Sequence, residues 1–212
     1  MTTGSIVKRG GDLLLATAGL VLLSPLFAAV WLAVRIVLGT PVFHADTRAG
    51  RNARPIRILK FRSMREAFDG AGRPLPDAER LGGFGRWLRR SSLDELPQLL
   101  SVLAGDMSLV GPRPLPLAYV PRYSPRQATR LEVLPGLTGW AQIHGRNRLG
   151  WSERLEYDAR YVEMRGRWYW PLIDLWIVAC TAVLVVWQAA TGRGISGPGS
   201  ATMEEFRGEF LP

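Results

Sequence analysis

The sequence LLLATAGLVLLSPLFAAVWLAVRIVL, residues Leu13 to Leu38, is a long, predominantly apolar stretch that decides the fold class of this chain. As one straight helix it would be roughly 39 Å long, enough to cross a hydrocarbon core of about 30 Å. Pro25 lies near its middle, removes one backbone donor and frees the carbonyl group of Val21. We therefore expect a helix with a kink at Ser24–Pro25.

The halves of this kinked helix predict its position in a membrane. Each half would be only about 18 to 21 Å long, too short to span a bilayer by itself. Lys8 and Arg9 precede the stretch and Arg48 follows it, whereas a spanning helix normally has one less basic side. We therefore predict a re-entrant anchor, residues 1–39, that enters and leaves through one membrane face. A tilted transmembrane helix and a cleaved signal peptide are the alternatives, although the stretch is long for a signal core.

A second apolar segment, WYWPLIDLWIVACTAVLVVWQAA, covers residues 168–190. Tryptophans near both of its ends suit the headgroup level of a bilayer, where amphipathic rings gather. The segment is long enough to span, to lie in the interface or to form a core helix. We assign it to the interface, as part of a catalytic domain that covers residues 40–195 and precedes a C-terminal tail, residues 196–212.

Composition restricts the classes of function. The chain has 212 residues, room for one globular domain plus membrane-contacting segments. Its 25 arginines and 2 lysines outnumber 18 acidic residues, and a net charge of +9 suits nucleic acid, an anionic membrane surface or a phosphorylated substrate. Cys180 is the only cysteine, which excludes an internal disulfide and a cysteine-based metal site. The two histidines, His44 and His144, are too few to indicate a zinc centre.

The polar middle of the chain predicts a small β part followed by helices. Residues 41–64 read as a β-hairpin, because two strand-like runs flank the turn-like sequence ADTRAGRNA. Residues 69–85 are rich in glycine and proline and predict a loop. The sequence MSLVGPRPLP, residues 107–116, reads as a stiff connection, and residues 151–164 read as a helix.

An acidic pair lies within the most basic part of the chain. The sequence SSLDELPQLLSVLAG predicts a helix that begins near Ser92 and ends at Gly105, with Asp94 and Glu95 in its first turn. Ser92 and Glu95 have the spacing of a capping box, which is the structural interpretation. Both carboxylates cannot make the same cap contact, because adjacent helical residues point about 100° apart. We expect the nearby arginines and the helix N-terminus to lower the pKa of the remaining carboxylate and keep it ionised and able to attack.

Several segments resemble a known family in the order in which that family has them. They are KFRSM (residues 60–64), LRRSSLDELPQLLSVLAGDMSLVGPRPL (88–115), PGLTGWAQIHGRN (135–147) and LEYDARYV (155–162). Together with the hairpin they are similar to the signature segments of the bacterial sugar transferases, the monotopic polyprenyl-phosphate phosphoglycosyltransferases. The chain resembles the minimal catalytic form. It departs from the family pattern at His144, where asparagine is expected.

The resemblance implies roles for individual residues. Asp94 would be the nucleophile, and Glu95 would bind Mg²⁺. The basic residues that would hold phosphate are Lys60, Arg62, Arg89, Arg113 and Arg146. Metal and arginine charge would offset the repulsion between a diphosphate and an attacking carboxylate. Asp158 is either a site residue or the i,i+4 partner of Arg154, and Trp140 is either a pocket floor or part of the core.

The resemblance also implies a fold and an activity. The expected fold is α+β and rich in helices: a monotopic membrane protein with a kinked re-entrant helix, a β-hairpin and a helical catalytic domain with interfacial helices. The expected reaction moves a sugar 1-phosphate from a UDP-sugar to a polyprenyl phosphate, through an aspartyl intermediate and with release of UMP. The domain would face the cytoplasm at the bacterial inner membrane. A membrane-tethered basic protein that binds or scaffolds without catalysis is the alternative, but an acidic pair in the most basic stretch disfavours nucleic acid.

Overall fold

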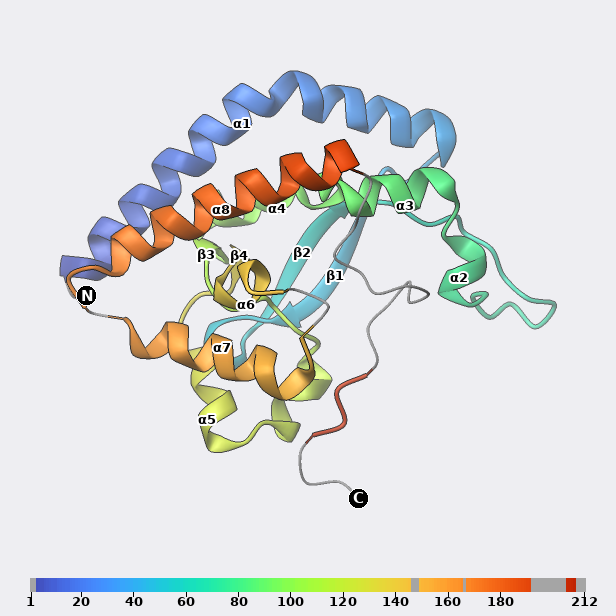
Figure 1. Ribbon diagram of the computed structural model, residues 1–212. Coiled ribbons are helices and arrows are strands. Elements are labelled where there is room, and N and C mark those ends of the chain that lie inside the picture. Colours follow the sequence, from blue (N-terminus) through green and yellow to red (C-terminus); the bar gives the residue numbers. More distant parts are fainter. Residues whose placement is uncertain (1–2, 146–148, 166, 192–204, 209–212) are drawn as a thin grey trace.

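The computed structural model describes residues 3–145, 149–165, 167–191 and 205–208. Its architecture is α+β and rich in helices, as the sequence predicts, with two small sheets beneath the longest helices (Figure 1). The helices are α1 (Thr3–Val37), α2 (Asp77–Arg80), α3 (Gly83–Arg90), α4 (Gln98–Ala104), α5 (Pro125–Ala128), α6 (Trp140–Ile143), α7 (Trp151–Glu163) and α8 (Trp170–Thr191). The 3₁₀ turns are η1 (Arg51–Ala53), η2 (Leu93–Glu95), η3 (Leu117–Arg122) and η4 (Thr129–Glu132). The strands are β1 (Phe43–Ala49), β2 (Pro55–Phe61), β3 (Ser108–Val110) and β4 (Gly136–Thr138).

Helix α1 is continuous but bent, and Figure 1 shows it as an arch over the rest of the molecule. Pro25 lies inside the helix, so the carbonyl group of Val21 loses its usual backbone donor. The Ser24 hydroxyl donates to that carbonyl at 2.8 Å and partly replaces the lost bond. The bend predicted at Ser24–Pro25 is present, and its cause is local.

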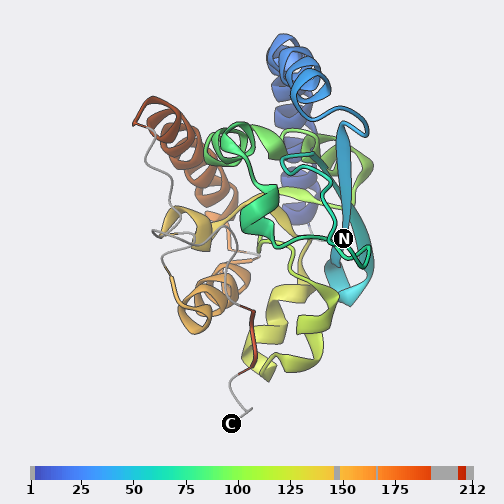
Figure 2. The ribbon, with the colours of Figure 1, turned by 90° about the vertical axis from the view of Figure 1, so that its right-hand side faces the viewer.

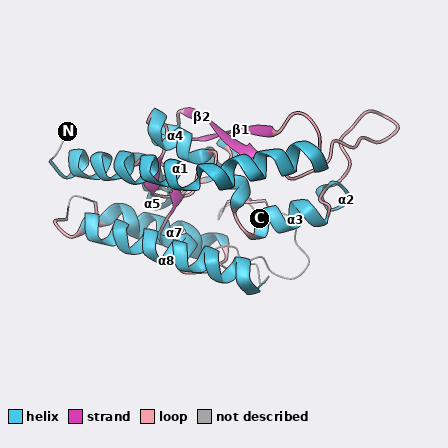
Figure 3. Ribbon diagram, turned by 90° about the horizontal axis from the view of Figure 1, so that it is seen from above, coloured by secondary structure: helices cyan, strands magenta, loops and turns pink. Residues whose placement is uncertain are grey.

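Helices α1 and α8 cover the same side of the molecule, as two further views show (Figures 2 and 3). Among the described residues, two helical stretches are long and apolar enough to cross a membrane, Ser5–Val37 and Trp170–Gln188. Only 11% of the most apolar window of each is buried inside the protein. This exposure argues against the interpretation of the second segment as a core helix, and it gives one face of the molecule a broad apolar surface.

The buried face of α1 is narrow and attaches the helix to two core clusters. In the first half of the helix, Ala16 packs into the central cluster with residues of β2, α4, β3, α7 and α8. In the second half, Val30 and Val34 pack against Phe61 and Leu88. Both halves of α1 therefore rest on the same folded unit.

The predicted hairpin is confirmed. Strands β1 and β2 are antiparallel, with Phe43 opposite Phe61 and Ala49 opposite Pro55. Asn52 and Ala53 take left-handed backbone conformations in the connecting turn. The hairpin brings Lys60, at the end of β2, against the turn η2 that carries the acidic pair.

Two predictions about the segment before α4 are wrong. The regular helix begins at Gln98 rather than near Ser92, and Pro97 is its N-cap, so Asp94 and Glu95 lie on the separate turn η2. Residues 69–85 are not a plain loop, because they contain α2 and the start of α3. The predicted end is correct, since Gly105 caps α4 in a left-handed conformation.

Long-range packing explains why the local sequence did not predict helix α3. Its sequence, GFGRWLRR, has two glycines, which disfavour a helix when considered alone. A Cβ atom at Gly85 would lie only 1.8 Å from the carbonyl oxygen of Ser63, so only glycine lets the two segments approach. Gly85 is therefore required by its close contact with Ser63, which lies more than twenty positions earlier in the chain.

A parallel pair of strands, β3 and β4, is also missing from the sequence prediction. Ser108 lies opposite Gly136 and Val110 opposite Thr138. Each strand has only three residues, too few to show an alternating pattern. The pairing positions the loop that follows β3, which carries Arg113.

A short described part of the C-terminal tail is docked on the folded unit. Phe206 is buried among the rings of Tyr119, Tyr123 and Trp151. Arg122 donates to the Glu205 carboxylate at 2.8 Å and also to the carbonyl group of Phe206. The division at residue 196 stays a prediction, because residues 192–204 lie outside the described part of the chain.

Candidate active site

The acidic pair lies where α3 turns sharply into η2. Ser92 takes a left-handed conformation (φ 56°), which a residue other than glycine rarely adopts, and it reverses the chain just before the pair. Both carboxylates are largely buried, with 7% of Asp94 and 8% of Glu95 exposed. Strained backbone beside buried acids is a frequent feature of functional sites.

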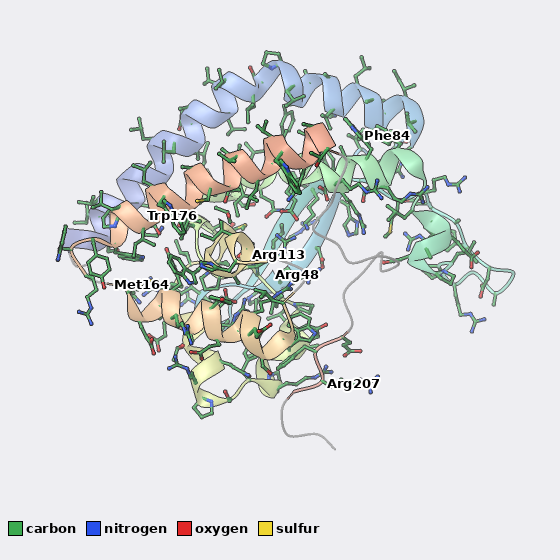
Figure 4. All side chains as sticks on the ribbon, viewed as in Figure 1. Arg48, Phe84, Arg113, Met164, Trp176 and Arg207 are labelled. Atoms are coloured by element: carbon green, nitrogen blue, oxygen red, sulfur yellow. The ribbon has the colours of Figure 1, made fainter. Side chains whose placement is uncertain are left out.

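Two cations from distant elements hold the Glu95 carboxylate. Lys60, from β2, donates to Oε1 at 3.0 Å. Arg113, from the loop after β3, donates to Oε2 at 3.1 Å and also to Oε1, so its guanidinium is bidentate. Figure 4 labels Arg113 near the middle of the molecule. Both basic residues therefore contact the acidic pair, and their role in holding phosphate stays a prediction.

The capping-box interpretation of Ser92 and Glu95 is wrong. Ser92 makes no side-chain cap hydrogen bond, and the Glu95 carboxylate turns instead toward Lys60 and Arg113. An acid that caps a helix would use its carboxylate locally, whereas these contacts join three separate segments of the chain.

Asp94 has a different environment from its neighbour. Its pKa is raised to about 6, mainly by burial and then by the Glu95 charge, while the charges of Lys60, Arg89 and Arg113 oppose both effects. The prediction of a lowered pKa is therefore wrong, because burial outweighs the surrounding cations. The carboxyl is nevertheless mostly ionised above pH 7. Within the described residues, no hydrogen bond to this carboxylate is formed, which leaves its oxygens available for attack.

The raised pKa gives a stability prediction. In the unfolded chain the carboxyl ionises near 3.8, so between that pH and about 6 the folded state binds more protons. The stabilisation from the protonated carboxyl is therefore lost as pH rises through this window. We expect Asp94→Asn to melt at a higher temperature than the wild type at pH 7.5, by a margin that shrinks at pH 5. Thermal unfolding in EDTA at both pH values measures this, and a margin that grows toward pH 5 would contradict it.

The other basic residues predicted to hold phosphate divide into two groups. Arg89 is close enough for its charge to act on Asp94, and its Nε donates to the Ser63 hydroxyl at 2.8 Å. Arg62 is directed elsewhere, since it donates to the carbonyl groups of Thr40, at 3.1 Å, and of Leu38, just after α1. These contacts give Arg62 a structural role that competes with the predicted phosphate contact.

The remaining sequence candidates contact other parts of the fold or lie outside the described residues. Arg146 belongs to the undescribed residues 146–148. Trp140 packs partly buried against the central cluster, which favours the core interpretation. The His144 ring stacks on Tyr157 and lies tilted against Trp140, with ring centroids 4.7 Å apart in each case.

Asp158 proves to be one half of a buried ion pair. Its partner is Arg130, from η4, with Nη2 of the arginine 2.9 Å from Oδ2 of the aspartate. The sequence analysis left Asp158 as either a site residue or the i,i+4 partner of Arg154. The charge of Arg154 does act on Asp158, but the close ion pair of this carboxylate is with Arg130. Arg130 was missed, because nothing in its local sequence distinguishes it from the other arginines.

The residues fit a magnesium ion only in combination with a substrate. Within the described residues, there is no group of three or more His, Cys, Asp or Glu side chains that could hold a metal. Magnesium is often bound by one or two carboxylates together with substrate phosphates, and Asp94 and Glu95 provide such hard oxygen donors. Because Lys60 and Arg113 already contact Glu95, they would have to share that carboxylate with the ion.

This geometry is suited to chemistry on a phosphate ester. It combines an ionisable, buried carboxylate with three nearby cations, and it lies on the unit that carries the apolar helices α1 and α8. A model of a protein family described as bacterial sugar transferase matches residues 3–188. The chain belongs to the bacterial sugar transferase family. The resemblance read from the sequence is therefore confirmed.

Named relatives of this sugar transferase differ in length. The uncharacterized sugar transferase EpsL of Bacillus subtilis is 43% identical over 203 residues, which cover 96% of each chain. The exopolysaccharide production protein ExoY of Rhizobium meliloti is 37% identical, over 76% of this chain and 78% of its own. The UDP-glucose:undecaprenyl-phosphate glucose-1-phosphate transferase of Escherichia coli is 40% identical over 77% of this chain but only 38% of its own. The match thus spans less than half the length of that relative.

Proposed function

We propose that this sugar transferase moves a sugar 1-phosphate from a UDP-sugar to a polyprenyl phosphate, as the first membrane step of polysaccharide or glycoconjugate assembly. The observation that carries the proposal is the buried Asp94 carboxylate beside three cations on a unit with two exposed apolar helices. The names of relatives from Escherichia coli, Xanthomonas campestris and Caulobacter vibrioides support UDP-glucose and undecaprenyl phosphate as first substrates to test.

The proposed reaction has two displacements at one phosphorus atom. First, an Asp94 carboxylate oxygen attacks the sugar-bearing phosphorus of the UDP-sugar. The bond from that phosphorus to the bridging oxygen breaks, and UMP leaves with the electron pair. A phosphate oxygen of the polyprenyl phosphate then attacks the same phosphorus, and the carboxylate of Asp94 is released. The product is a polyprenyl diphosphate sugar, and no oxidant or additional phosphate donor is needed.

The cations near the pair would bind and neutralise the diphosphate. Lys60 and Arg113 contact Glu95, and Arg89 lies close enough to influence Asp94. A bidentate guanidinium suits phosphate oxygens as well as carboxylate oxygens. Arg146 remains a proposed phosphate ligand from the family resemblance. Magnesium, when bound through Glu95 and substrate phosphates, would further reduce the negative charge that repels an incoming carboxylate.

The direct test is UMP release by purified protein with magnesium, undecaprenyl phosphate and a panel of UDP-sugars. With the preferred sugar, UMP and a lipid diphosphate sugar should form in equal amounts. A protein that only binds or scaffolds would release no UMP with any member of the panel. No described contact favours that alternative.

We also propose that α1 is re-entrant, and contacts at its first turns support this. Lys8 donates to Asp174 of α8 at 2.6 Å, and Arg9 donates to the carbonyl group of Val102 at 2.8 Å. Asp12 accepts from the Ser108 hydroxyl at 2.7 Å. The start of α1 is thus bonded to the same unit on which its end packs, and the bend lies between them at the top of the arch (Figure 1).

This topology predicts the accessibility of two engineered cysteines. In a Cys180→Ser background, Thr3→Cys and Thr47→Cys should both resist a membrane-impermeant thiol reagent applied outside intact cells, which also tests the cytoplasmic orientation. Labelling of Thr3→Cys alone would show that α1 crosses the bilayer.

Pro25→Leu tests the cause of the bend. The substitution restores the missing donor to the Val21 carbonyl, so α1 should straighten and expose the amino terminus in the same labelling experiment. Unchanged topology and turnover would show that the contacts of Lys8, Arg9 and Asp12 maintain the bend without the proline.

A further inference from the structure

Arg130 is a buried arginine with three different partners. Its Nε and Nη2 donate to Oδ2 of Asp158 at 3.1 and 2.9 Å. Its Nη1 donates to the Tyr123 hydroxyl at 3.1 Å, and Nη2 also donates to the backbone carbonyl of Arg113 at 2.6 Å. Only 3% of Arg130 and 1% of Asp158 are exposed.

Stability alone is a weak explanation for such a pair. Two charges lose their hydration when they are buried, and apolar replacements of similar volume are often neutral or stabilising. Burial raises the pKa of Asp158 despite the Arg130 charge. Burial also disfavours the charged form of Arg130, but the charges and hydrogen bonds of Asp158 and Tyr123 together outweigh it and raise the Arg130 pKa. The more informative contact of Arg130 is therefore its hydrogen bond to the backbone carbonyl of Arg113.

The segment that carries Arg113 is held through its carbonyl groups. The carbonyl of Pro112 accepts from the amide of Gly136, and that of Leu115 accepts from the amide of Ala49, both at 2.9 Å. Between them, the Arg113 carbonyl accepts from a side chain, that of Arg130. The first two bonds are backbone contacts, so Arg130 makes the one of these three bonds that a substitution can remove.

We infer that Arg130, oriented by Asp158, is a positioning residue that fixes the Arg113 peptide and so aims the Arg113 guanidinium at Glu95 and the substrate diphosphate. This inference rests on the proposed function. A tilt of the peptide is amplified along the arginine side chain, and a displacement of about 1 Å in a catalytic arrangement can cost about 100-fold in rate.

Arg130→Lys is the first test. Lysine keeps the charge opposite Asp158 but lacks the planar fork that reaches three partners at once. We expect a folded protein whose kcat for UMP release falls about 10- to 100-fold. Wild-type kcat in a variant that has lost the bond to the Arg113 carbonyl would overturn the inference.

Tyr123→Phe is the matched control. It removes one hydrogen bond of the same guanidinium but leaves the bonds to Asp158 and to the Arg113 carbonyl. We expect kcat within about threefold of the wild type. An equal loss in both variants would show that general loosening around Arg130, rather than the contact with Arg113, limits the rate.

A double-mutant cycle with Arg113→Lys separates positioning from a purely structural role. If Arg130 acts through Arg113, Arg130→Lys should cost less than about threefold once Arg113 has been replaced. If the two losses multiply, the residues act independently and the inference is wrong.

Hydrogen–deuterium exchange provides a readout that does not depend on activity. Peptides that cover residues 107–117 should exchange faster in Arg130→Lys than in the wild type or in Tyr123→Phe. An inactive wild type with this exchange pattern would contradict the proposed function and leave the positioning role supported. Unchanged exchange in an active enzyme would contradict only the positioning role.

A second variant covers the case in which Arg130→Lys does not fold. Arg130→Met combined with Asp158→Leu replaces the whole ion pair by apolar side chains, which removes both buried charges. We expect a folded protein with the same reduction in kcat as Arg130→Lys. Wild-type turnover by this double variant would overturn the inference.

Discussion

Asp94→Asn is expected to abolish sugar phosphate transfer, with UMP release reduced about 1,000-fold or more. An amide oxygen is a poor nucleophile toward phosphorus, and loss of a nucleophile is among the most damaging substitutions in an enzyme. Intact-protein mass spectrometry after incubation with UDP-sugar alone should show an added phosphosugar on the wild type and none on the variant.

The variant carries its own control for folding. At neutral pH the Asp94 carboxylate is ionised although burial disfavours its charge. Its replacement by asparagine should therefore raise the melting temperature while it removes activity. Opposite effects on stability and turnover are expected of a residue retained for chemistry. Turnover of Asp94→Asn at wild-type levels would rule out an aspartyl intermediate at this position.

Glu95→Gln is expected to reduce turnover about 100-fold or more. The substitution removes the hard anionic oxygen proposed for magnesium and the carboxylate that Lys60 and Arg113 contact directly. UMP release across a magnesium titration should show a weaker dependence on the ion than in the wild type. Near-normal turnover with a changed melting temperature would mean that Glu95 has only a structural role.

Loss of the charge also lowers stability, so two comparisons are needed. Glu66→Gln makes the same chemical change at an exposed acid that pairs with Arg62 at 3.6 Å, and it should leave turnover unchanged. Lys60→Met combined with Glu95→Gln restores the charge balance around the pair. It should regain part of the lost stability without regaining activity, because neither residue is then able to assist the reaction.

Some features were predictable because their causes lie within a few residues. The bend of α1 follows from Pro25 and the carbonyl four positions earlier, and Gly105 ends α4 through its own left-handed backbone. The hairpin was recognisable from two strand-like runs around a turn. The family segments identified Asp94, Glu95 and most of the surrounding cations, because those residues occur together in short motifs.

Features that depend on long-range packing were not predictable. Helix α3 contains glycines because Gly85 contacts Ser63, and the strands β3 and β4 are too short to show a pattern. Arg62 and Arg130 are both arginines in a basic chain. Their different roles became visible only from the carbonyl groups that each one contacts, those of Leu38 and Thr40 for Arg62 and that of Arg113 for Arg130.

The sequence by itself determined the class of protein, the apolar helices, the hairpin and the acidic pair, since periodicity, proline, glycine and short motifs are local signals. Only the tertiary structure decided how deeply the two carboxylates are buried, in which direction the Asp94 pKa shifts and which cations contact Glu95. Burial of a carboxylate is a collective property of all the segments packed around it, so the direction of the Asp94 pKa reverses once η2 is enclosed. The same packing decides which cation holds Glu95 and which arginine holds the Arg113 peptide, because hydrogen bonds between distant segments depend on how the chain folds.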